Sequence, residues 1–228
     1  MDAESLKKLA GEKAAEFVKD GMVVGLGTGS TVHYTILKLG QLVRSGDISI
    51  IGIPTSKATE KLAVTNGIKL GTLDDYPKID LTIDGADEID PNLDLIKGMG
   101  GALLREKVVA SVSKEVIIIA DESKSVELLG TRSALPVEVV PFALATAKAA
   151  LEKLCSEAIL REKNGSIYVS DNGNFILDCR FDSITEPGKT EAELNLIPGV
   201  VENGLFIGMA TRAILGTGNG IRIIEKTT

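Results

Sequence analysis

Apolar residues alternate between two spacings over the first 130 positions. They recur at helical spacing over residues 6–18, and the segment MVVGLG at 22–27 then forms a continuous apolar run. The first pattern predicts a helix and the second a buried strand. The alternation predicts further helices at 31–44, 57–66 and 102–113, and strands at 48–54, 68–73, 78–84 and 116–121. Short apolar strands separated by helices predict a mostly parallel sheet with helices on both faces, which is a Rossmann-like α/β domain.

The pattern changes near Gly130. Strands are predicted at 135–141, 158–162, 167–181 and 199–204, and helices at 143–155 and near Thr190. The segment 167–181 contains turn residues at Asp171 to Asn174. The order β-α-β-β-α-β resembles a ferredoxin-like α+β fold. The tail has apolar runs around the turn GTGNG, and we expect it to rejoin the first sheet. We therefore predict a catalytic domain from residues 1–130 and 205–228, and a smaller α+β domain at 131–204 with a possible oligomer contact.

Composition and charge narrow the classes of function. The net charge of −7 and the absence of Trp argue against nucleic-acid binding, which needs basic surfaces and stacking rings. The N-terminus has no apolar signal segment, and no window reaches the ~18 apolar residues of a membrane span, so we expect a cytoplasmic protein. Cys155 and Cys179 are expected to be free thiols, and His33, the only histidine, is expected to be a helix residue without chemistry. The chain therefore has too few histidines and cysteines to favour a histidine-dependent catalytic triad or a zinc site.

The segment GLGTGST at residues 25–31 lies where a strand is predicted to pass into a helix. Backbone N–H groups at such a junction can hold an anion. A dinucleotide fingerprint would need a third glycine where this chain has Ser30, and no GK[ST] of a nucleotide-binding loop follows. The alternatives are a tight turn with a helix cap at Ser30 or Thr31, and an anion site. The hydroxyls of Thr28, Ser30 and Thr31 favour the anion site.

The segment DGADEID at residues 84–90 also follows a predicted strand. Ligands of open α/β sheets bind at the carboxyl ends of strands, so this loop and the glycine loop are expected to face one pocket. Asp84 and Asp87 would bind hydroxyls while the glycine loop holds an anionic group, which suits a polyol phosphate. The alternatives are a Mg²⁺ or Ca²⁺ site, although the spacing fails that of an EF-hand, and a solvated acidic turn.

The segment KGMGGALLREK at residues 97–107 places Lys97 beside glycines and Glu106 in a predicted helix. Apolar residues cover most of that helix's circumference, so we expect it to be largely buried. Arg105 and Lys107 are expected to face solvent or a subunit contact, and contact with phosphate is the alternative. Glu106 is then either a first-turn residue favoured by the helix dipole or a desolvated carboxylate whose pKa is raised. Only the second could act as a general base.

Eight segments in order resemble the type A family of ribose-5-phosphate isomerases, and the resemblance spans nearly the whole chain. They are GLGTGSTV, PTSKAT, DGADEID, KGMGGALLREKVVA, IADESK, LPVEVVP, SDNGNFILD and IPGVVENGLF. The resemblance implies an aldose-ketose isomerase of the non-oxidative pentose phosphate pathway that interconverts ribose 5-phosphate and ribulose 5-phosphate. It also implies that the enzyme uses no metal or organic cofactor and forms a homodimer or, in some members, a tetramer.

The same resemblance implies roles for individual residues. Glu106 would be the general base, Lys97 would stabilise an enediolate, and Asp84 and Asp87 would orient hydroxyls and assist ring opening. Met99 stands where other members commonly have glycine. The implied substrate-binding residues are Lys7, Thr28, Gly29, Ser30, Thr31, Asp84, Gly85, Ala86, Asp87, Lys97, Gly98, Met99, Gly100 and Lys124.

Two alternatives from other classes remain at this stage. Sensor domains of some repressors resemble this fold, but such proteins carry a DNA-binding module, for which the predicted first helix leaves no room. A CoA-transferase-like enzyme would also use a catalytic glutamate. The combination of DGADE with KGMGG favours the isomerase.

Overall fold

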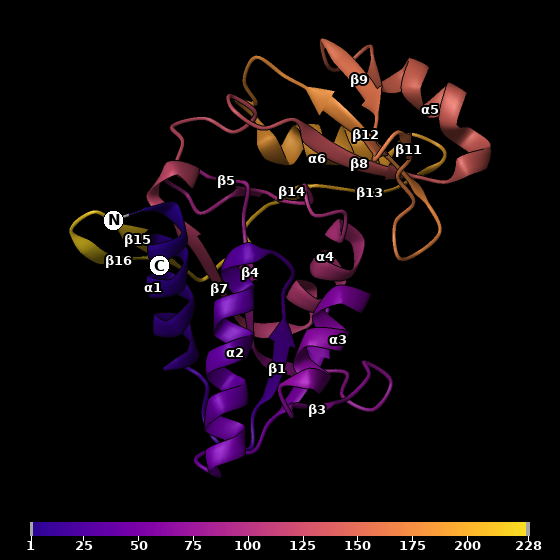
Figure 1. The fold of residues 1–228 in the computed structure, drawn as a ribbon. Coiled ribbons are helices and arrows are strands. Elements are labelled where there is room, and N and C mark those ends of the chain that lie inside the picture. Colours follow the sequence, from indigo (N-terminus) through magenta and orange to yellow (C-terminus); the bar gives the residue numbers. More distant parts are fainter. Residues whose placement is uncertain (1, 227–228) are drawn as a thin grey trace. The chain divides into compact units, whose positions relative to one another are not determined.

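A seven-stranded sheet forms the centre of the first of two compact units in the computed structural model, which describes residues 2–226 (Figure 1). The first unit contains the chain up to Ala86, Arg105–Lys124 and the residues from Gly208 onward. The second contains Asp87–Leu104 and Ser125–Ile207. Among residues 2–226, no helix combines the length and the apolar character needed to cross a membrane.

The sheet of the first unit is mostly parallel, as predicted. Only the pair at one edge, β15 and β16, is antiparallel, and this hairpin is the predicted return of the tail to the first sheet. In spatial order the strands are β16 (Gly220–Glu225), β15 (Arg212–Thr217), β7 (Ser113–Asp121), β4 (Ile79–Gly85), β1 (Val23–Leu26), β2 (Ile51–Pro54) and β3 (Lys69–Leu70).

Helices cover both faces of this sheet, because successive side chains of a strand point to opposite faces. On β1, Val24 and Leu26 pack into an apolar cluster that includes residues of three helices, whereas Val23 joins a second cluster with Val109 of a fourth helix. The helices of this unit are α1 (Ala3–Ala15), α2 (Ser30–Ser45), α3 (Lys57–Thr65) and α4 (Leu103–Ser111), of which α4 begins in the second unit.

The strand order reverses between β1 and β4. The chain adds β2 and β3 on one side of β1, and then β4, β7 and β15 on the other side. Leu26 and Ile83 are partners in the parallel β1–β4 pair, so the loops after these strands leave the sheet next to each other. Such a reversal is where open α/β sheets bind their ligands.

The second unit has the predicted ferredoxin-like arrangement. Its four strands are antiparallel in the order β13 (Val200–Asn203), β8 (Leu135–Val139), β12 (Phe175–Arg180) and β9 (Glu157–Leu160). The helices α5 (Leu144–Leu151) and α6 (Pro187–Asn195) complete the β-α-β-β-α-β order. One apolar cluster joins these strands and helices and includes Val137, Ala147, Leu177 and Leu194.

Two small sheets of the second unit were not predicted. One has three strands, β14 (Leu205–Phe206), β6 (Leu95–Ile96) and β5 (Glu88–Ile89), and the other pairs β10 (Glu162–Lys163) with β11 (Ser166–Ile167). The segment predicted at 167–181 has its turn where the sequence predicts it, at Asp171–Asn174: Ser170 N–H donates to Asn174 O across this turn, and β12 starts at Phe175. Two-residue strands carry no readable period, so the sequence pattern does not reveal them.

Two short 3₁₀ turns complete the structure: η1 (Glu122–Lys124) follows β7, and η2 (Pro141–Ala143) precedes α5.

Candidate active site

The glycine loop connects β1 to the N-terminus of α2. Gly27 N–H donates to Ile83 O at 3.0 Å, which ties the loop to the neighbouring strand β4. Gly29 is the cap residue of α2 and has a φ of 136°, a conformation that favours glycine. The predicted alternative of a side-chain cap at Ser30 or Thr31 is therefore wrong, because both residues already lie inside the helix. Gly29 has no side chain to occupy the first N–H groups of α2, which leaves this end suited to an anion.

The carboxylate of Asp84 lies against this loop. Asp84 ends the buried part of β4 and is only 2% exposed. Its Oδ1 accepts hydrogen bonds from Thr28 N–H at 3.1 Å and Gly85 N–H at 2.7 Å. A Cβ atom on Gly27 would come within 2.2 Å of the same oxygen. The loops after β1 and β4 are thus in direct contact, and the contact requires glycine at position 27.

A cluster of buried hydroxyls supports the glycine loop from α3 and the end of β2. Thr28 Oγ1 lies 2.7 Å from Thr55 Oγ1, 2.8 Å from Ser56 Oγ and 3.2 Å from Thr59 Oγ1. Thr55 and Thr59 also donate to the carbonyls of Leu26 and Gly27, at 3.1 and 2.8 Å. The Thr28 side chain is therefore engaged inside the protein, and Ser30 is the exposed hydroxyl of the loop.

This hydroxyl cluster (Thr55, Ser56, Thr59) was not predicted as functional. All three residues belong to PTSKAT, one of the segments that resemble the isomerase family, but the resemblance implied no role for them. The available signal is three hydroxyl residues within five positions, directly after the strand that pairs with β1.

A cavity of about 640 Å³ opens beside the glycine loop. It is bordered by the loop itself and by side chains of α1, α2 and α3, among them His33 and Leu62. The His33 ring packs edge-on against Tyr34, with 5.6 Å between ring centroids.

Lys7 of α1 pairs with an acid next to this cavity. Its Nζ lies 2.7 Å from Glu4 Oε1, and Glu4 Oε2 accepts a hydrogen bond from the Tyr34 hydroxyl at 2.8 Å. The hydrogen bonds from Lys7 and from Tyr34 lower the pKa of Glu4, and the bond to Glu4 raises the pKa of Tyr34. Glu4 borders the cavity, so Lys7 is held by a carboxylate of the cavity wall.

Glu106 lies on the buried side of α4 and is 3% exposed. The buried positions Leu103, Glu106, Lys107 and Ala110 follow the i, i+3, i+4, i+7 spacing of one helix face. Lys107 is 6% exposed, so the expectation that it faces solvent is wrong, and Val108, at 42% exposed, takes the outward position. Two ionisable residues therefore occupy the stripe that apolar residues usually fill. Burying a charged group is costly, so such a placement is typical of functional carboxylates.

Lys124 lies in η1, directly after β7. Asp121 Oδ1 accepts a hydrogen bond from Ser123 N–H at 3.0 Å and so shapes this turn. The segments GTGST, DGAD and DESK thus lie at the carboxyl ends of three adjacent strands, β1, β4 and β7.

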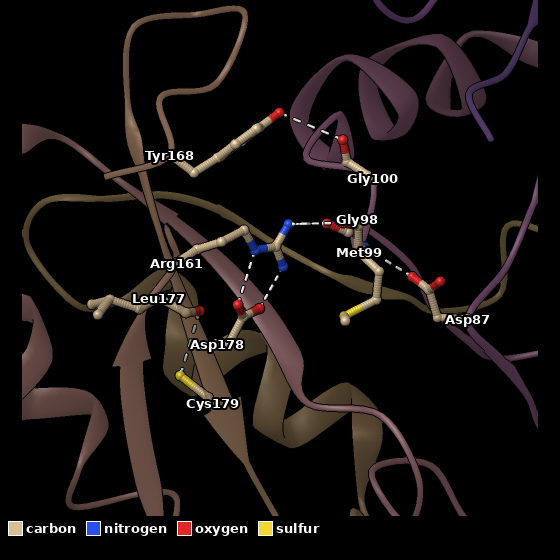
Figure 2. A network of polar contacts seen from close by, with 9 residues as sticks. All are labelled: Asp87, Gly98, Met99, Gly100, Arg161, Tyr168, Leu177, Asp178 and Cys179. Carbon is tan, nitrogen blue, oxygen red and sulfur yellow. Dashed lines mark hydrogen bonds and ion pairs between the residues drawn. The ribbon is translucent and has the colours of Figure 1, made fainter. Parts of the chain in front are cut away.

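The remaining candidates lie in the second unit. Lys97 is 3% exposed, and its Nζ lies 5.3 Å from the centre of the Phe206 ring. Asp87 Oδ2 accepts a hydrogen bond from Met99 N–H at 3.0 Å, as Figure 2 shows. Gly98 has a φ of 105°, whereas Met99 is not among the described residues with positive φ and is 50% exposed. A methionine is therefore accommodated at this position without backbone strain.

No group of three His, Cys, Asp or Glu suited to a metal ion occurs in the part of the chain that the structure describes.

The two units divide the candidate residues between them. The first unit holds Lys7, Thr28, Gly29, Ser30, Thr31, Asp84, Gly85, Ala86, Glu106 and Lys124, and the second holds Asp87, Lys97, Gly98, Met99 and Gly100.

Known proteins are similar to this chain in both sequence and fold. Residues 51–220 match the family described as ribose 5-phosphate isomerase A (phosphoriboisomerase A). The ribose-5-phosphate isomerase A of Gloeobacter violaceus is 50% identical over 228 residues, covering 100% of this chain and 99% of the relative. That of Bacillus mycoides is 55% identical over 219 residues, covering 96% of this chain and 98% of the relative.

Solved structures agree. A D-ribose-5-phosphate isomerase in complex with phospho-erythronic acid has a TM-score of 0.96 and 43% identity, and the match covers 99% of this chain and 100% of that one. The family match, the full-length relatives and the shared fold lead to one conclusion: this chain belongs to the ribose 5-phosphate isomerase A family.

Proposed function

We propose that this protein interconverts D-ribose 5-phosphate and D-ribulose 5-phosphate through an enediolate, with Glu106 as the general base. The observation that carries the proposal is the burial of Glu106, 3% exposed, on the inward stripe of α4. A carboxylate held away from water is suited to removing a proton from carbon, because burial disfavours its charged form. The membership of the chain in the isomerase family supports the same reaction.

The reaction moves a carbonyl group from C1 to C2 of the open-chain sugar. Glu106 would take the proton from C2 and return it to C1, so that one base serves both carbons, while the proton of the C2 hydroxyl moves to the oxygen on C1. The intermediate carries negative charge on oxygen, and the ammonium group of Lys97 would stabilise it. Asp84 and Asp87 would orient hydroxyl groups and move the hydroxyl proton when the ring opens.

The phosphate would bind at the N-terminus of α2. The backbone N–H groups of Gly29 to Thr31 and the exposed Ser30 hydroxyl are suited to an anion there. Lys7 would reach the same phosphate and leave its pairing with Glu4 when substrate arrives. Lys124 would contact the substrate from the end of β7. Binding energy from the phosphate then positions the reacting carbons, although the phosphate takes no part in the chemistry.

We further propose where and how the enzyme operates. It acts in the cytoplasm, in the non-oxidative pentose phosphate pathway, with no metal or organic cofactor. The Rossmann-like domain, residues 1–130 and 205–228, carries the chemistry. Residues 131–204 form the smaller domain, which contributes to a homodimer or a tetramer.

A coupled assay tests the reaction directly. Ribose 5-phosphate is supplied in the presence of EDTA, and the formation of ribulose 5-phosphate is followed. We expect full activity, because the reaction as proposed uses no metal. Activity that is lost in EDTA and restored by Mg²⁺ or Mn²⁺ would instead indicate a metal site at Asp84 and Asp87. A glutamyl adduct formed from acyl-CoA, without ketose formation, would indicate a CoA-transferase.

A further inference from the structure

Side chains distant in sequence hold the glycine turn, which we define as residues 98–101 (Figure 2). Arg161 Nη1 donates to Gly98 O at 2.8 Å and to Met99 O at 3.1 Å. The Tyr168 hydroxyl donates to Gly100 O at 3.5 Å. Two side chains thus bind three consecutive carbonyls of the turn that follows Lys97.

Arg161 is itself fixed to the four-stranded sheet. Its Nε donates to Asp178 Oδ2 at 2.9 Å, and its Nη2 contacts Asp178 Oδ1, which makes a two-point ion pair. The arginine side chain is 11% exposed and the aspartate side chain 20%. The guanidinium also lies 5.9 Å from the centre of the Tyr168 ring. Asp178 belongs to β12 and Arg161 directly follows β9, its paired neighbour, so the guanidinium connects a rigid sheet to the turn.

The turn has little internal support of its own. Its backbone hydrogen bond joins Gly101 N–H to Gly98 O at 2.9 Å. Gly98 and Gly101 have φ values of 105° and 81°, so the segment contains the residue type with the most conformational freedom. Without outside contacts, the peptides of such a turn would sample several orientations. Arg161, Tyr168 and Asp87 select one of them.

The contacts decide where the N–H groups of the turn point. A peptide group is planar, with its carbonyl and N–H directed to opposite sides. Because the Met99 carbonyl faces Arg161, the N–H of Gly100 in the same peptide points away from the guanidinium. The preceding N–H, that of Met99, is already bound to Asp87. Gly100 N–H is therefore the donor that Arg161 orients.

We propose that Arg161 is a positioning residue of the isomerase: it holds the glycine turn so that Gly100 N–H and Lys97 meet the oxyanion of the enediolate. The inference rests on the proposed role of the Lys97 to Gly100 segment in substrate binding. Arginine suits this task because its planar group can bind a carboxylate with one edge and two carbonyls with another. Lysine carries a single ammonium group, which cannot bind the carboxylate and the two carbonyls in the same way.

The test compares Arg161→Met and Arg161→Lys with a matched control, Arg180→Met. Arg180 lies on β12, is 68% exposed and pairs with Glu157 at 3.6 Å, so its removal leaves the turn intact. We expect kcat of both Arg161 variants to fall about 10- to 100-fold with a smaller change in KM, because misplacement of about 1 Å costs that much. The control should keep kcat within about twofold of the wild type.

A second measurement separates positioning from a general loss of structure. Phospho-erythronic acid carries a carboxylate as well as a phosphate, whereas inorganic phosphate probes only the phosphate site. The inhibition constant of phospho-erythronic acid should rise at least tenfold in Arg161→Met, and that of inorganic phosphate should stay unchanged. Added methylguanidine should restore part of the kcat of Arg161→Ala, since it refills the vacated position.

The outcomes distinguish this inference from the proposed function. Lys97→Ala is measured alongside: if it loses activity while both Arg161 variants keep theirs, the role of Arg161 is overturned and the substrate segment stands. If Lys97→Ala is fully active, the assignment of the substrate segment fails first. An equal rise in the inhibition constants of phospho-erythronic acid and inorganic phosphate would also overturn the positioning role. Should Arg161→Met fail to fold, Arg161→Lys decides with the same thresholds.

Discussion

The carboxylate of Asp84 touches the backbone of Gly27, and a Cβ atom at position 27 would lie 2.2 Å from Asp84 Oδ1. Asp84 Oδ1 also accepts the N–H of Thr28, so one oxygen links the ends of two adjacent strands. This contact fixes the acidic loop relative to the phosphate loop that we propose. Changes at either residue should therefore affect catalysis and folding together.

Gly27→Ala should displace Asp84, because no real Cβ contact is this short. We expect a destabilisation of about 1–3 kcal/mol from overpacking, and about a 100-fold loss in kcat/KM from the misplaced carboxylate. Thermal unfolding and steady-state kinetics measure the two effects. Gly188→Ala is the control, since its new Cβ would have no neighbour closer than 3.9 Å. A Gly27→Ala enzyme with wild-type kinetics would contradict the tight contact.

Glu106→Gln should reduce kcat by roughly two to four orders of magnitude with a smaller change in KM. Glutamine keeps the shape of the side chain but cannot accept a proton from carbon, so the fold should persist. Circular dichroism and the coupled assay check both points. Glu60→Gln, an exposed change on α3, is the matched control. If Glu106→Gln retains most of its kcat, Glu106 is not the general base.

Thr59→Val should loosen the glycine loop, because it removes a hydroxyl that donates to Gly27 O and is 5% exposed. Loss of a buried hydrogen bond of this kind costs about 1–3 kcal/mol. We expect a corresponding drop in stability to urea and a higher KM for ribose 5-phosphate. Thr65→Val on the same helix provides the comparison, since Thr65 is exposed and bonds only within the helix, to Lys61 O. Identical behaviour of the two variants would rule out a supporting role for the hydroxyl cluster.

Lys7→Met should weaken phosphate binding and raise KM roughly tenfold, the size expected for loss of one charge-assisted hydrogen bond, while kcat changes less. The neighbouring Lys8 is 58% exposed and pairs loosely with Glu12 at 3.9 Å, so Lys8→Met serves as the control. The KM difference should shrink as salt is added, because the interaction is electrostatic. An unchanged KM in Lys7→Met would remove Lys7 from the phosphate site.

Much of the fold follows from the sequence because long elements carry a readable period. The helices at 31–44 and 57–66, for example, are observed as Ser30–Ser45 and Lys57–Thr65. The contact between Asp84 and the glycine loop also follows from a general rule, because both segments end parallel strands at the point where strand order reverses. In these cases local patterns and sheet geometry are sufficient.

Other features depend on partners that no local pattern reveals. Lysine is usually a surface residue, yet Lys107 lies on the buried face of α4, as Glu106 does. Arg161 lies 63 positions from Gly98, whose carbonyl it binds, and nothing around it in the sequence marks that contact. The hydroxyls of PTSKAT resemble an ordinary helix start, which Ser56 indeed provides by capping α3. Their second role, binding the glycine loop, arises only from the pairing of β1 with β2.

The position of β15 and β16 in the sheet has a consequence for synthesis on the ribosome. β15 pairs with β7, but it is made only after the second unit, whose last residue is Ile207, has been translated. The four-stranded sheet of the second unit therefore has all of its strands before the seven-stranded sheet does. Until residues 212–225 emerge, the edge of β7 that β15 will cover has no partner strand. A nascent chain stalled before that point would thus expose an open apolar strand edge, the feature that promotes aggregation.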